Sequence, residues 1–488
     1  MEEYFSVPVP TEDTECIGKL NADQRHAYDT VMNAITLKNG GAFFVDGPGG
    51  TGKTYLYRAI LATIKGRGEI AIPTTTSGIA ATLLHQGRSS HSTFQLPLKP
   101  DSSSSCTFTK GSKSGILLKH SSVIIWDEAP MTHRYQFEAV DRSLKDLMGN
   151  DLPFGGKIIV FGGDFRQVLP VVRNGTRAQM IDASLIRSPL WNHISVLQLR
   201  ENMRSRHDNG FANFLLSIGN GDEPTISDDM IKLPSNMVIP TVADTSIDGL
   251  IDQIFPNLNE HIGDGNFMVE RAIITPLNEN ADRINDKVIE RFLGEGRTYY
   301  SFDSVPDDTR NLYQQEFLNS IVASGLPPHV LKLKPGVPLM LLRNIDPKNG
   351  LCKGTRLLCH SLKDHFIDAE ILTGHARGNR VFLPRIPLKT AEDIRLPFEM
   401  VRKQFPVKLS FGLTINKSQG QTIPHVGIYL PDHVFSHGQL YVALSRGISE
   451  NTTKITVDNG KIRGKEGVFT KNIVYKEVLL LLHSVSYI

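Results

Sequence analysis

The sequence predicts an α/β fold built on a parallel sheet, and three stretches of the 488-residue chain lead to this prediction. The first is GPGGTGKT, residues 47–54, which follows the apolar run AFFVD and opens the helical pattern KTYLYRAILATIK. The other two, SVIIWDEAPM and IIVFGGDFRQVLPV, are apolar runs that end in polar clusters. The run EIAIP after the helix completes a strand–loop–helix–strand unit, and such a βαβ unit requires a parallel sheet.

A helix is predicted before the first strand. Asn21 is a suitable N-cap, and the apolar residues that follow it, including Ala27 and Val31, share one face at helical spacing. Gly40 and Gly41 end this helix, as glycine commonly does just past a helix terminus. The first strand, at 42–46, therefore emerges from a capped helix and leads directly into the glycine-rich stretch.

The glycine-rich stretch has the spacing of a phosphate-binding loop, G-x-x-x-x-G-K-[ST], in the strand-to-helix context that this motif requires. Backbone N–H groups of such a loop surround phosphate oxygens, and the helix N-terminus adds partial positive charge. Lys53 is expected to reach the β- and γ-phosphates, and the Thr54 hydroxyl to ligate Mg²⁺. The predicted nucleotide-binding residues here are Gly47, Pro48, Gly49, Gly50, Thr51, Gly52, Lys53, Thr54 and Tyr55.

Polar residues at two further strand ends complete a predicted hydrolytic site. Asp127 and Glu128 follow the apolar run 123–126, at the end of a strand where α/β sheets bind ligands. Asp127 is expected to hold Mg²⁺, and Glu128 to act as the base that orients the attacking water. Gln167 is suited to sensing a γ-phosphate, whereas Asp164 and Arg166 beside it are equally consistent with a local ion pair.

Composition limits the classes of function. The formal net charge is only +2, so any nucleic-acid binding requires a local groove and not a global positive field. The four cysteines form no C-x-x-C pair or zinc spacing, which favours reduced thiols in an intracellular compartment. The first 16 residues contain no Lys or Arg, and the apolar run 478–482 is far too short to cross a bilayer. No signal peptide, transit peptide or membrane contact is therefore predicted.

Nine motifs in order resemble those of superfamily 1B helicases of the petite-integration-frequency (Pif-one) type. They are LNADQ, GPGGTGKT, TTSGIAA, SSHSTF, WDEAPM, GGDFRQVLPV, LRENMR, LTINKSQGQT and GQLYVALSR. The stretch FEAVDRSLKDLMGNDLPFGGKIIVFGGDFRQ resembles that family's own signature, and NIVYKEVLL is similar to its plant and Helitron-transposon branch. The resemblance runs from about Leu20 to the end of the chain. It implies two RecA-like motor domains, with a small β-rich, SH3-like insertion in the second.

Resemblance and local patterns together predict the domain boundaries. Alternating strand and turn signals, rich in Pro and Gly, predict the β-rich insertion, and Ser, Gly and Lys predict a flexible shorter one. The predicted parts are a loose N-terminal segment at 1–20, a first RecA-like domain at 21–195 with the short insertion at about 97–116, a second RecA-like domain at 196–300 and 409–488, and the SH3-like insertion at 301–408.

The resemblance also implies nucleotide contacts outside the phosphate loop. Gln24 would read the adenine base, and Gln419 and Gly420 would line the same cleft. Arg204 and Arg446 would reach the γ-phosphate from the second domain, where a guanidinium neutralises charge on the equatorial oxygens. ATP and Mg²⁺ are the implied cofactors. Hydrolysis would require both domains to close on one nucleotide.

A groove for single-stranded DNA is implied between the two domains. Ser, Thr and Lys side chains suit contacts with the phosphate backbone, which carry no sequence information. Phe94 suits stacking on a base but equally suits packing in the core. The implied DNA-binding residues are Ser77, His91, Ser92 and Phe94 in the first domain and Thr414, Lys417 and Ser418 in the second.

The resemblance implies an ATP-dependent DNA helicase that moves 5′-to-3′ on single-stranded DNA and unwinds tailed or forked duplex. It implies roles in DNA repair, recombination or telomere maintenance, in the nucleus or alternatively the mitochondrion, and identifies no protein partner. One alternative is another P-loop enzyme such as a kinase, which would lack the second set of arginines. The other is a catalytically lapsed strand-binding remnant of a Helitron helicase, which would be expected to lose residues such as Lys53 and Glu128.

Overall fold

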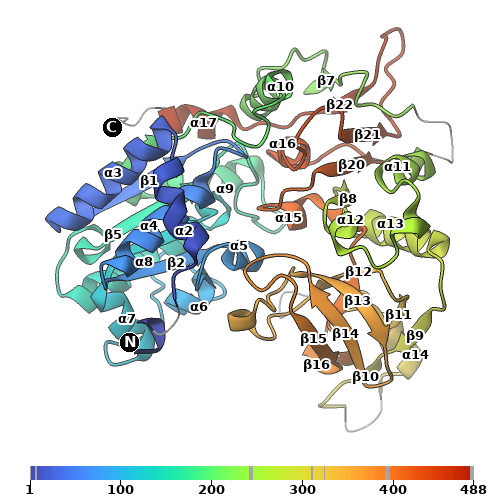
Figure 1. Ribbon diagram of the computed structural model, residues 1–488, viewed down its shortest axis with the longest axis horizontal. Helices are drawn as coiled ribbons and strands as arrows, with labels where there is room; N and C mark the ends of the chain where they lie inside the picture. The colour runs from blue at the N-terminus through green and yellow to red at the C-terminus, as the bar shows by residue number, and fades with distance from the viewer. Residues whose placement is uncertain are drawn as a thin grey trace.

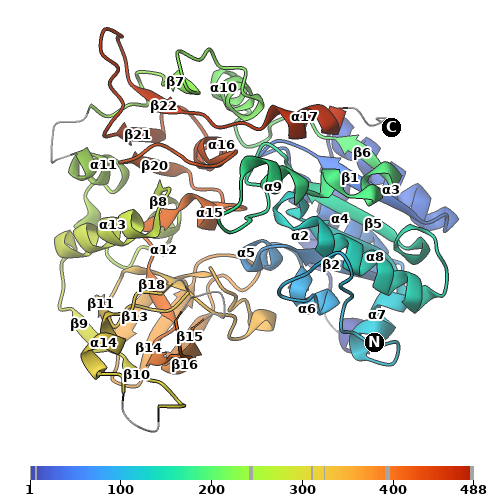
Figure 2. The same cartoon turned by 180° about the vertical axis from the view of Figure 1, so that it is seen from behind.

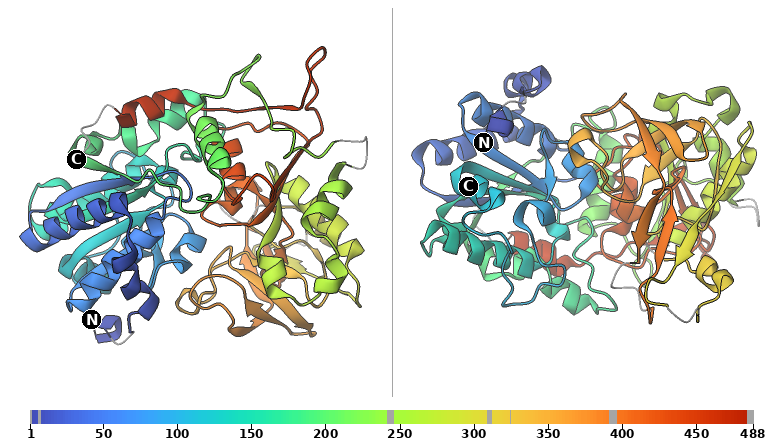
Figure 3. Two further views of the ribbon diagram at one scale, coloured as in Figure 1. Left: turned by 45° about the horizontal axis from the view of Figure 1, so that its top comes forward. Right: turned by 90° about the horizontal axis from the view of Figure 1, so that it is seen from below.

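The computed structural model describes residues 2–5, 8–240, 246–308, 312–323, 325–390 and 396–483. Figure 1 shows two α/β lobes side by side, with a β-rich region beneath the second lobe. The first lobe is blue to green, the second lobe is green and red, and the β-rich region is yellow to orange. The view from below in Figure 3 shows the first lobe on one side and the other two bodies together on the other.

The first lobe is built on a six-stranded, wholly parallel sheet with the strand order β3-β2-β4-β5-β1-β6. Its strands are β1 (Gly41–Asp46), β2 (Ile70–Thr75), β3 (Arg88–Ser89), β4 (Ser121–Asp127), β5 (Ile158–Gly163) and β6 (Ile194–Gln198). Its helices are α3 (Ala22–Leu37), α4 (Lys53–Gly66), α5 (Gly78–Thr82), α6 (Ser90–Phe94), α7 (Lys113–His120), α8 (Arg134–Met148) and α9 (Arg177–Asp182). The predicted α/β class and parallel sheet are confirmed.

The central strands of this sheet are mostly apolar because helices cover both faces. Successive side chains of a strand point to opposite faces, and β4 shows the consequence. Ile124 and Trp126 pack in the cluster that includes α8, whereas Val123 and Ile125 pack in the cluster that includes α3 and α4. The carboxyl ends of β1, β4 and β5 therefore stand on a sheet held from both sides.

The second lobe has a smaller parallel sheet with the order β19-β8-β20-β21. Its strands are β8 (Arg271–Thr275), β19 (Gly412–Thr414), β20 (His425–Leu430) and β21 (Thr453–Val457), and β7 (Met230–Lys232) pairs separately with β22 (Phe469–Lys471). Its helices are α10 (Asn209–Asn220), α11 (Ser246–Ile254), α12 (Gly265–Val269), α13 (Asn278–Arg291), α15 (Ile415–Ser418) and α16 (Gln439–Leu444). Because β8 precedes the β-rich region and β19 follows it, the chain leaves this sheet and returns to it.

The β-rich region is antiparallel. Its sheets have the orders β15-β14-β13-β12-β18, β10-β17-β16 and β11-β9. The elements are β9 (Arg297–Tyr300), β10 (Phe302–Ser304), α14 (Gln315–Ser320), β11 (Val330–Leu333), β12 (Pro338–Leu341), β13 (Arg356–Leu362), β14 (Phe366–Ile371), β15 (Arg380–Pro384), β16 (Ile386–Lys389), β17 (Val401–Gln404) and β18 (Val407–Leu409).

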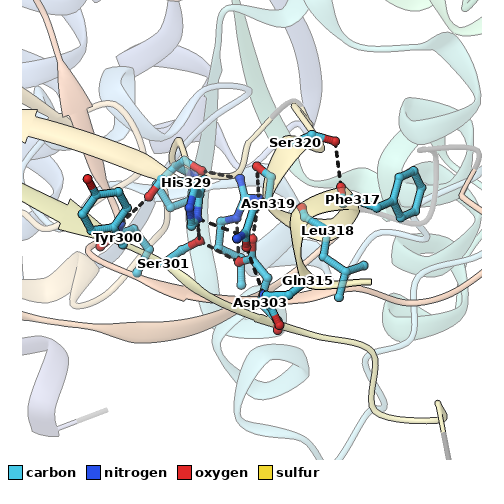
Figure 4. Close-up of polar contacts among 12 residues, drawn as sticks. Tyr300, Ser301, Asp303, Gln315, Phe317, Leu318, Asn319, Ser320 and His329 are labelled. Atoms are coloured by element: carbon cyan, nitrogen blue, oxygen red, sulfur yellow. Dashed lines mark hydrogen bonds and ion pairs between the residues drawn. The ribbon is translucent and has the colours of Figure 1, made fainter. Parts of the chain in front are cut away.

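A buried polar cluster holds the edge of this region together. Asp303 on β10 forms an ion pair with Arg402 on β17 at 2.7 Å, and both side chains are almost wholly buried. The Ser301 hydroxyl donates to the same carboxylate at 2.8 Å, and His329 lies against Ser301, as Figure 4 shows. Because Asp303 has these partners, its charge is satisfied inside the region and is a structural feature.

The N-terminal segment is predicted to be loose, but it packs on the first lobe. Helix α2 (Thr11–Glu15) packs on α4, where Arg58 forms an ion pair with the buried Asp13, and Cys16 is 2% exposed. A further short helix, α1 (Glu2–Phe5), precedes it, and the Tyr4 hydroxyl donates to the backbone carbonyl of Ala71. A five-residue helix is too short to show periodicity, so the sequence pattern did not predict it.

The C-terminal helix α17 (Lys476–His483) lies on the first lobe and not on the second, so the predicted assignment of 409–488 to one domain is wrong at its end. Val478, Leu479 and Leu482 join the core cluster of the first lobe. Figure 2 shows α17 against that lobe after the chain crosses from β22. Within the described ranges, no helix has both the length and the apolar character needed to span a bilayer.

Candidate nucleotide-binding site

The loop between β1 and α4 has a backbone that requires glycine at two positions. Gly50 and Gly52 have φ angles of 96° and 79°, in the left-handed region that side chains disfavour. A Cβ atom on Gly52 would lie 2.4 Å from Nε2 of Gln24, and one on Gly50 would lie 2.5 Å from Oδ1 of Asn202. Neighbouring side chains thus pack directly against the loop.

The loop leaves backbone donors free for an anion. In the part of the chain that the structure describes, the N–H groups of Gly52, Lys53 and Thr54 donate to no protein acceptor. They stand at the N-terminus of α4, where the helix dipole favours negative charge. The Lys53 ammonium donates to the carbonyls of Gly47 and Pro48 in the same loop. These groups fit the phosphates of a nucleotide.

Asp127 and Glu128 lie at the end of β4, and both are buried. Burial and, to a smaller extent, the neighbouring Asp127 raise the pKa of Glu128 to about 7, while Lys53 and Arg446 oppose the shift. Burial also raises the pKa of Asp127, and Lys53 opposes that shift. A carboxylate that titrates near neutral pH suits a general base.

The backbone at Glu128 is held in an uncommon conformation. Its φ angle is 54°, in the left-handed region that is costly for a residue other than glycine. Its carbonyl accepts a hydrogen bond from the Thr76 hydroxyl at 2.8 Å, and its N–H donates to Oδ1 of Asp127 at 2.9 Å. Strain of this kind persists where the surroundings fix a side chain for function.

The second lobe reaches the same carboxylate. Nε2 of Gln419 lies 3.4 Å from Oε2 of Glu128, and a Cβ atom on Gly420 would lie 3.7 Å from Oε1 of Glu128. The Arg446 guanidinium is buried and donates only to neutral oxygens, including the Gln421 carbonyl at 2.9 Å and the Ser445 hydroxyl at 2.9 Å. The structure therefore brings residues predicted from both domains to one cleft.

Arg204 lies beside Arg446. Part of its side chain is exposed, but its guanidinium sits within the cleft and donates to the Ser445 carbonyl at 2.5 Å. Burial, together with the neighbouring Arg446, lowers the pKa of Arg204 to about 9, and burial also lowers the pKa of Arg446. Two buried guanidinium groups in one cleft, which donate to neutral oxygens, form a site for a polyanion.

Two buried amide oxygens in the cleft have no donor among the described residues. These are Oε1 of Gln167 and Oε1 of Gln419, on side chains that are 4% and 5% exposed. A buried acceptor without a partner is costly, and a water molecule can supply the missing hydrogen bond. Both positions suit the orientation of an attacking water next to Glu128.

Gln24 ties the first helix of the lobe to the phosphate loop. Its Oε1 accepts from the Asn21 N–H at 3.1 Å in a capping box, and its Nε2 donates to the Thr51 carbonyl at 3.1 Å. Each end of the amide retains one further hydrogen-bonding position, so the reading of adenine stays a prediction. Tyr55, the last residue predicted for the loop, is half-buried on the first turn of α4.

The residues predicted to bind DNA differ in how far they are exposed. Ser77 is half-buried and caps α5, and Ser92 is exposed. His91 is half-buried, with Nε2 3.3 Å from Nε2 of Gln136. Across the cleft, Thr414 is buried at the start of α15.

Lys417 stands on α15 next to Thr414. Its ammonium donates to Oδ1 of Asn278 at 2.7 Å. Burial and, to a smaller extent, the neighbouring Lys408 lower the pKa of Lys417 to about 8. No described contact tests whether this lysine binds DNA, so its role stays a prediction.

Two of the predicted DNA contacts are wrong. Phe94 is 0% exposed and stacks on Trp126 with ring centroids 4.9 Å apart, so it belongs to the core. Ser418 is also 0% exposed, and its hydroxyl donates to the Ile415 carbonyl at 2.7 Å within the same short helix. Each side chain points inward because the neighbouring strand or helix turn fixes its direction, which the motif alone does not reveal.

The sequence reasoning missed four contributors to the cleft. Asn202 donates to the Gly49 carbonyl at 3.4 Å and accepts from the Arg204 N–H at 3.0 Å. The Tyr57 hydroxyl lies buried near Asp127 and Glu128 and has no hydrogen-bond partner within the described ranges. Tyr441 and His437 bridge the lobes. Asn202 and Tyr441 lie inside the motifs LRENMR and GQLYVALSR, so these motifs could have identified both residues as parts of the cleft.

Two parallel-sheet lobes that meet at one phosphate loop, with Arg204 beside the loop and Arg446 reaching in from the second lobe, define the class of two-lobed P-loop nucleoside triphosphatases. The comparisons with known proteins give the family. Residues 19–229 match the family model of the PIF1-like helicase, and residues 316–362 match that of the 2B domain of the DNA helicase Pif1. Over these two segments the chain is similar to the PIF1-like helicases.

Relatives and solved structures agree with this family. The ATP-dependent DNA helicase PIF1 of Xenopus laevis is 24% identical over 434 residues, covering 88% of this chain and 60% of the relative. That of Bdellovibrio bacteriovorus is 25% identical, covering 88% and 85%. This chain thus spans less than two thirds of the frog relative.

The solved structures share the fold. Bacteroides Pif1 bound to ssDNA superposes with a TM-score of 0.65 at 23% identity, covering 93% of this chain and 95% of that one. Candida albicans Pif1 superposes with a TM-score of 0.65 at 22% identity, covering 96% and 99%. The similarity to the plant and Helitron branch stays a prediction.

Proposed function

We propose that this chain is an ATP-dependent DNA helicase that hydrolyses ATP with Mg²⁺ while moving 5′-to-3′ along single-stranded DNA. The observation that carries the proposal is the pair Arg204 and Arg446, whose guanidinium groups donate to no carboxylate among the described residues. Arg204 lies against the phosphate loop, and Arg446 reaches the cleft from the second lobe. A P-loop kinase has no need of such a pair from a second lobe. A nucleotide triphosphate would satisfy both cations and the free loop amides at once.

Each side chain in the cleft has a role in the proposed hydrolysis of ATP. Glu128 accepts the proton of the attacking water, and the free oxygens of Gln167 and Gln419 orient that water. Arg204 and Arg446 neutralise the charge that develops on the transferred phosphoryl group, an effect worth about 10³–10⁵ in turnover where an arginine finger operates.

Thr54 and Asp127 are the residues that would hold Mg²⁺. They are an oxygen-donor set, as this ion prefers, and a bound magnesium ion would supply charge neutralisation at the β- and γ-phosphates. Among the described residues no group of three His, Cys, Asp or Glu side chains forms a denser metal site. This agrees with an ion held by two protein ligands and the nucleotide.

Movement along DNA would follow from closure of the lobes. Ser77 caps α5 on the first lobe and Lys417 lies on α15 of the second, two helices that lie side by side in Figures 1 and 2. Closing the lobes would therefore change the spacing of two contacts with the strand. The polarity and the roles in repair, recombination or telomere maintenance are supported by the family resemblance. The relatives named above are ATP-dependent DNA helicases, and solved Pif1 structures hold ssDNA and forked dsDNA.

One experiment tests the proposal. ATP hydrolysis is measured with and without single-stranded DNA, and unwinding is measured on duplexes tailed at the 5′ or the 3′ end. The proposal expects stimulation by DNA, unwinding of the 5′-tailed duplex, and loss of both in Lys53→Ala with DNA binding retained. Indifference to DNA would favour a kinase, DNA binding without hydrolysis would favour a lapsed remnant, and preference for the 3′ tail would overturn the polarity.

A further inference from the structure

The hydroxyl of Tyr441 joins the second lobe to two parts of the first. Tyr441 lies on α16 and is 1% exposed. Its hydroxyl accepts a hydrogen bond from the Gly49 N–H in the phosphate loop at 2.9 Å and donates one to Oδ2 of Asp164 at 2.8 Å. One oxygen atom thus bridges the phosphate loop and the segment that follows β5.

Asp164 connects this bridge to the hydrolytic residues. Its Oδ1 accepts from Arg166, whose Nε in turn donates to Oδ1 of Asn220 on α10 at 2.8 Å. Its Oδ2, the atom that Tyr441 contacts, also lies 3.5 Å from Nε2 of Gln167. The position of Asp164 therefore sets the position of the glutamine whose free oxygen faces the cleft.

Two glycines leave room for the tyrosine. A Cβ atom on Gly219 of α10 would lie 3.0 Å from the ring of Tyr441, tighter than ordinary contact. A Cβ atom on Gly49 would lie 3.3 Å from Cβ of Ser445 and 3.7 Å from the Tyr441 hydroxyl. Backbone therefore lies close to the ring at Gly219 and close to the hydroxyl at Gly49.

We propose that Tyr441 is a positioning residue that couples lobe closure to the placement of Gln167 through Asp164. This inference rests on the proposed hydrolysis of ATP by the closed lobes. The two hydrogen bonds form only when the lobes meet, because their partners belong to opposite lobes. Without the hydroxyl, closure leaves the Gly49 N–H and Asp164 short of a buried partner, whereas in an open cleft water solvates both.

The experiment compares Tyr441→Phe with Tyr429→Phe. Tyr429 lies on β20 of the same lobe, and its hydroxyl donates to Asp458 at 2.9 Å, away from the nucleotide cleft. DNA-stimulated hydrolysis by the full chain gives kcat and KM for ATP, and thermal unfolding gives Tm. The inference expects Tyr441→Phe to lower kcat about tenfold with KM changed less than about threefold and Tm preserved, because a buried unpaired polar group costs this much.

A second readout separates positioning from a general structural role. Trapping with ADP and aluminium fluoride reports the closed state, and the inference expects Tyr441→Phe to trap in smaller yield than Tyr429→Phe. Equal kcat and trapping in the two variants would overturn the inference, as would a loss of activity explained by a lower Tm. If Tyr441→Phe does not fold, Gly219→Ala, whose added methyl group crowds the Tyr441 ring and Cδ of Arg166, must show the same selective loss of kcat. An inactive wild-type chain would instead contradict the proposed function.

Discussion

The two sides of the nucleotide cleft carry opposite charges and differ in how they are held. On the first lobe, Asp127, Glu128 and Asp164 are buried carboxylates at the ends of a rigid sheet. On the other side, Arg204 and Arg446 are cations whose pKa values burial has lowered. The comparison shows that the charges on either side of the cleft are not fully balanced within that side. The carboxylates Asp127 and Glu128 lie near the loop lysine, whereas the two arginines donate only to neutral oxygens among the described residues, so a nucleotide between the lobes would supply their anionic partner.

The largest expected effect comes from removing one of these arginines. Arg446→Ala should lower ATP turnover by about a thousandfold or more, because the phosphoryl charge loses its partner from the second lobe. Steady-state hydrolysis with saturating single-stranded DNA measures it. Arg206→Ala is the matched control, since Arg206 is exposed two positions after Arg204. Similar turnover in both variants would contradict the role of the second lobe.

A third contact between the lobes is made by His437, and here the side chain is an uncharged imidazole, unlike the charged groups on the two sides of the cleft. Nε2 of His437 donates to the Phe165 carbonyl of the first lobe at 2.8 Å, and Nδ1 accepts from the Tyr475 N–H at 2.8 Å. Burial lowers the pKa of His437 to about 4. The unfolded chain, with its histidine near 6.5, therefore binds more protons between these values, so stability falls as pH drops through this window.

This linkage predicts a loss of about 2 kcal/mol in unfolding free energy between pH 7 and pH 5. Urea unfolding of wild type and His437→Asn at both pH values isolates the contribution. The wild type should lose about 2 kcal/mol more than the variant over this interval. An identical pH dependence of the two proteins would show that His437 does not titrate as its burial requires.

The raised pKa of Glu128 predicts how ATP turnover depends on pH. Because burial raises the pKa of Glu128 to about 7, the base is protonated below that pH. Turnover under saturating ATP and DNA should fall about tenfold per pH unit below the apparent pKa and level off above it. Binding of single-stranded DNA, measured over the same range, is the control. A flat profile between pH 6 and 8 would remove Glu128 from the role of base.

The smallest effect is expected in the strand groove. Lys417→Ala should weaken binding of single-stranded DNA several-fold and reduce the slope of log affinity against log salt by about one. Fluorescence anisotropy over a salt series measures both quantities. Lys461, exposed on a distant loop, supplies the control Lys461→Ala. If both variants bind like the wild type, α15 does not contact the strand.

The sequence predicted well those features that are formed by residues close together in the chain. The strand–loop–helix unit at Lys53 and the acids at the end of β4 are contiguous in the chain, so their spacing determines their geometry. The arginines Arg204 and Arg446 required the family resemblance, because residues more than 200 positions apart meet only after both sheets form. The antiparallel β-rich region was also predicted, since turn signals and alternation are local.

What the sequence did not predict depended on tertiary packing. From the sequence, Phe94 could equally stack on a DNA base or pack in the core. The structure shows that it stacks on Trp126 in the core. Helix α17 follows β22 in sequence, yet it packs on the first lobe because the apolar face of that lobe covers it. The role of Tyr441 depends on a glycine in another lobe. The strand polarity, the nuclear location and the reading of adenine by Gln24 stay predictions.

A crystal structure with ADP, Mg²⁺ and aluminium fluoride tests most directly whether both lobes serve one nucleotide. The account predicts that the guanidinium groups of Arg204 and Arg446 both lie within hydrogen-bonding distance of the fluoride group, with the Glu128 carboxylate beside the attacking water. A ligand bound by the phosphate loop alone, with both arginines still donating to the carbonyl groups of their own lobe, would contradict it.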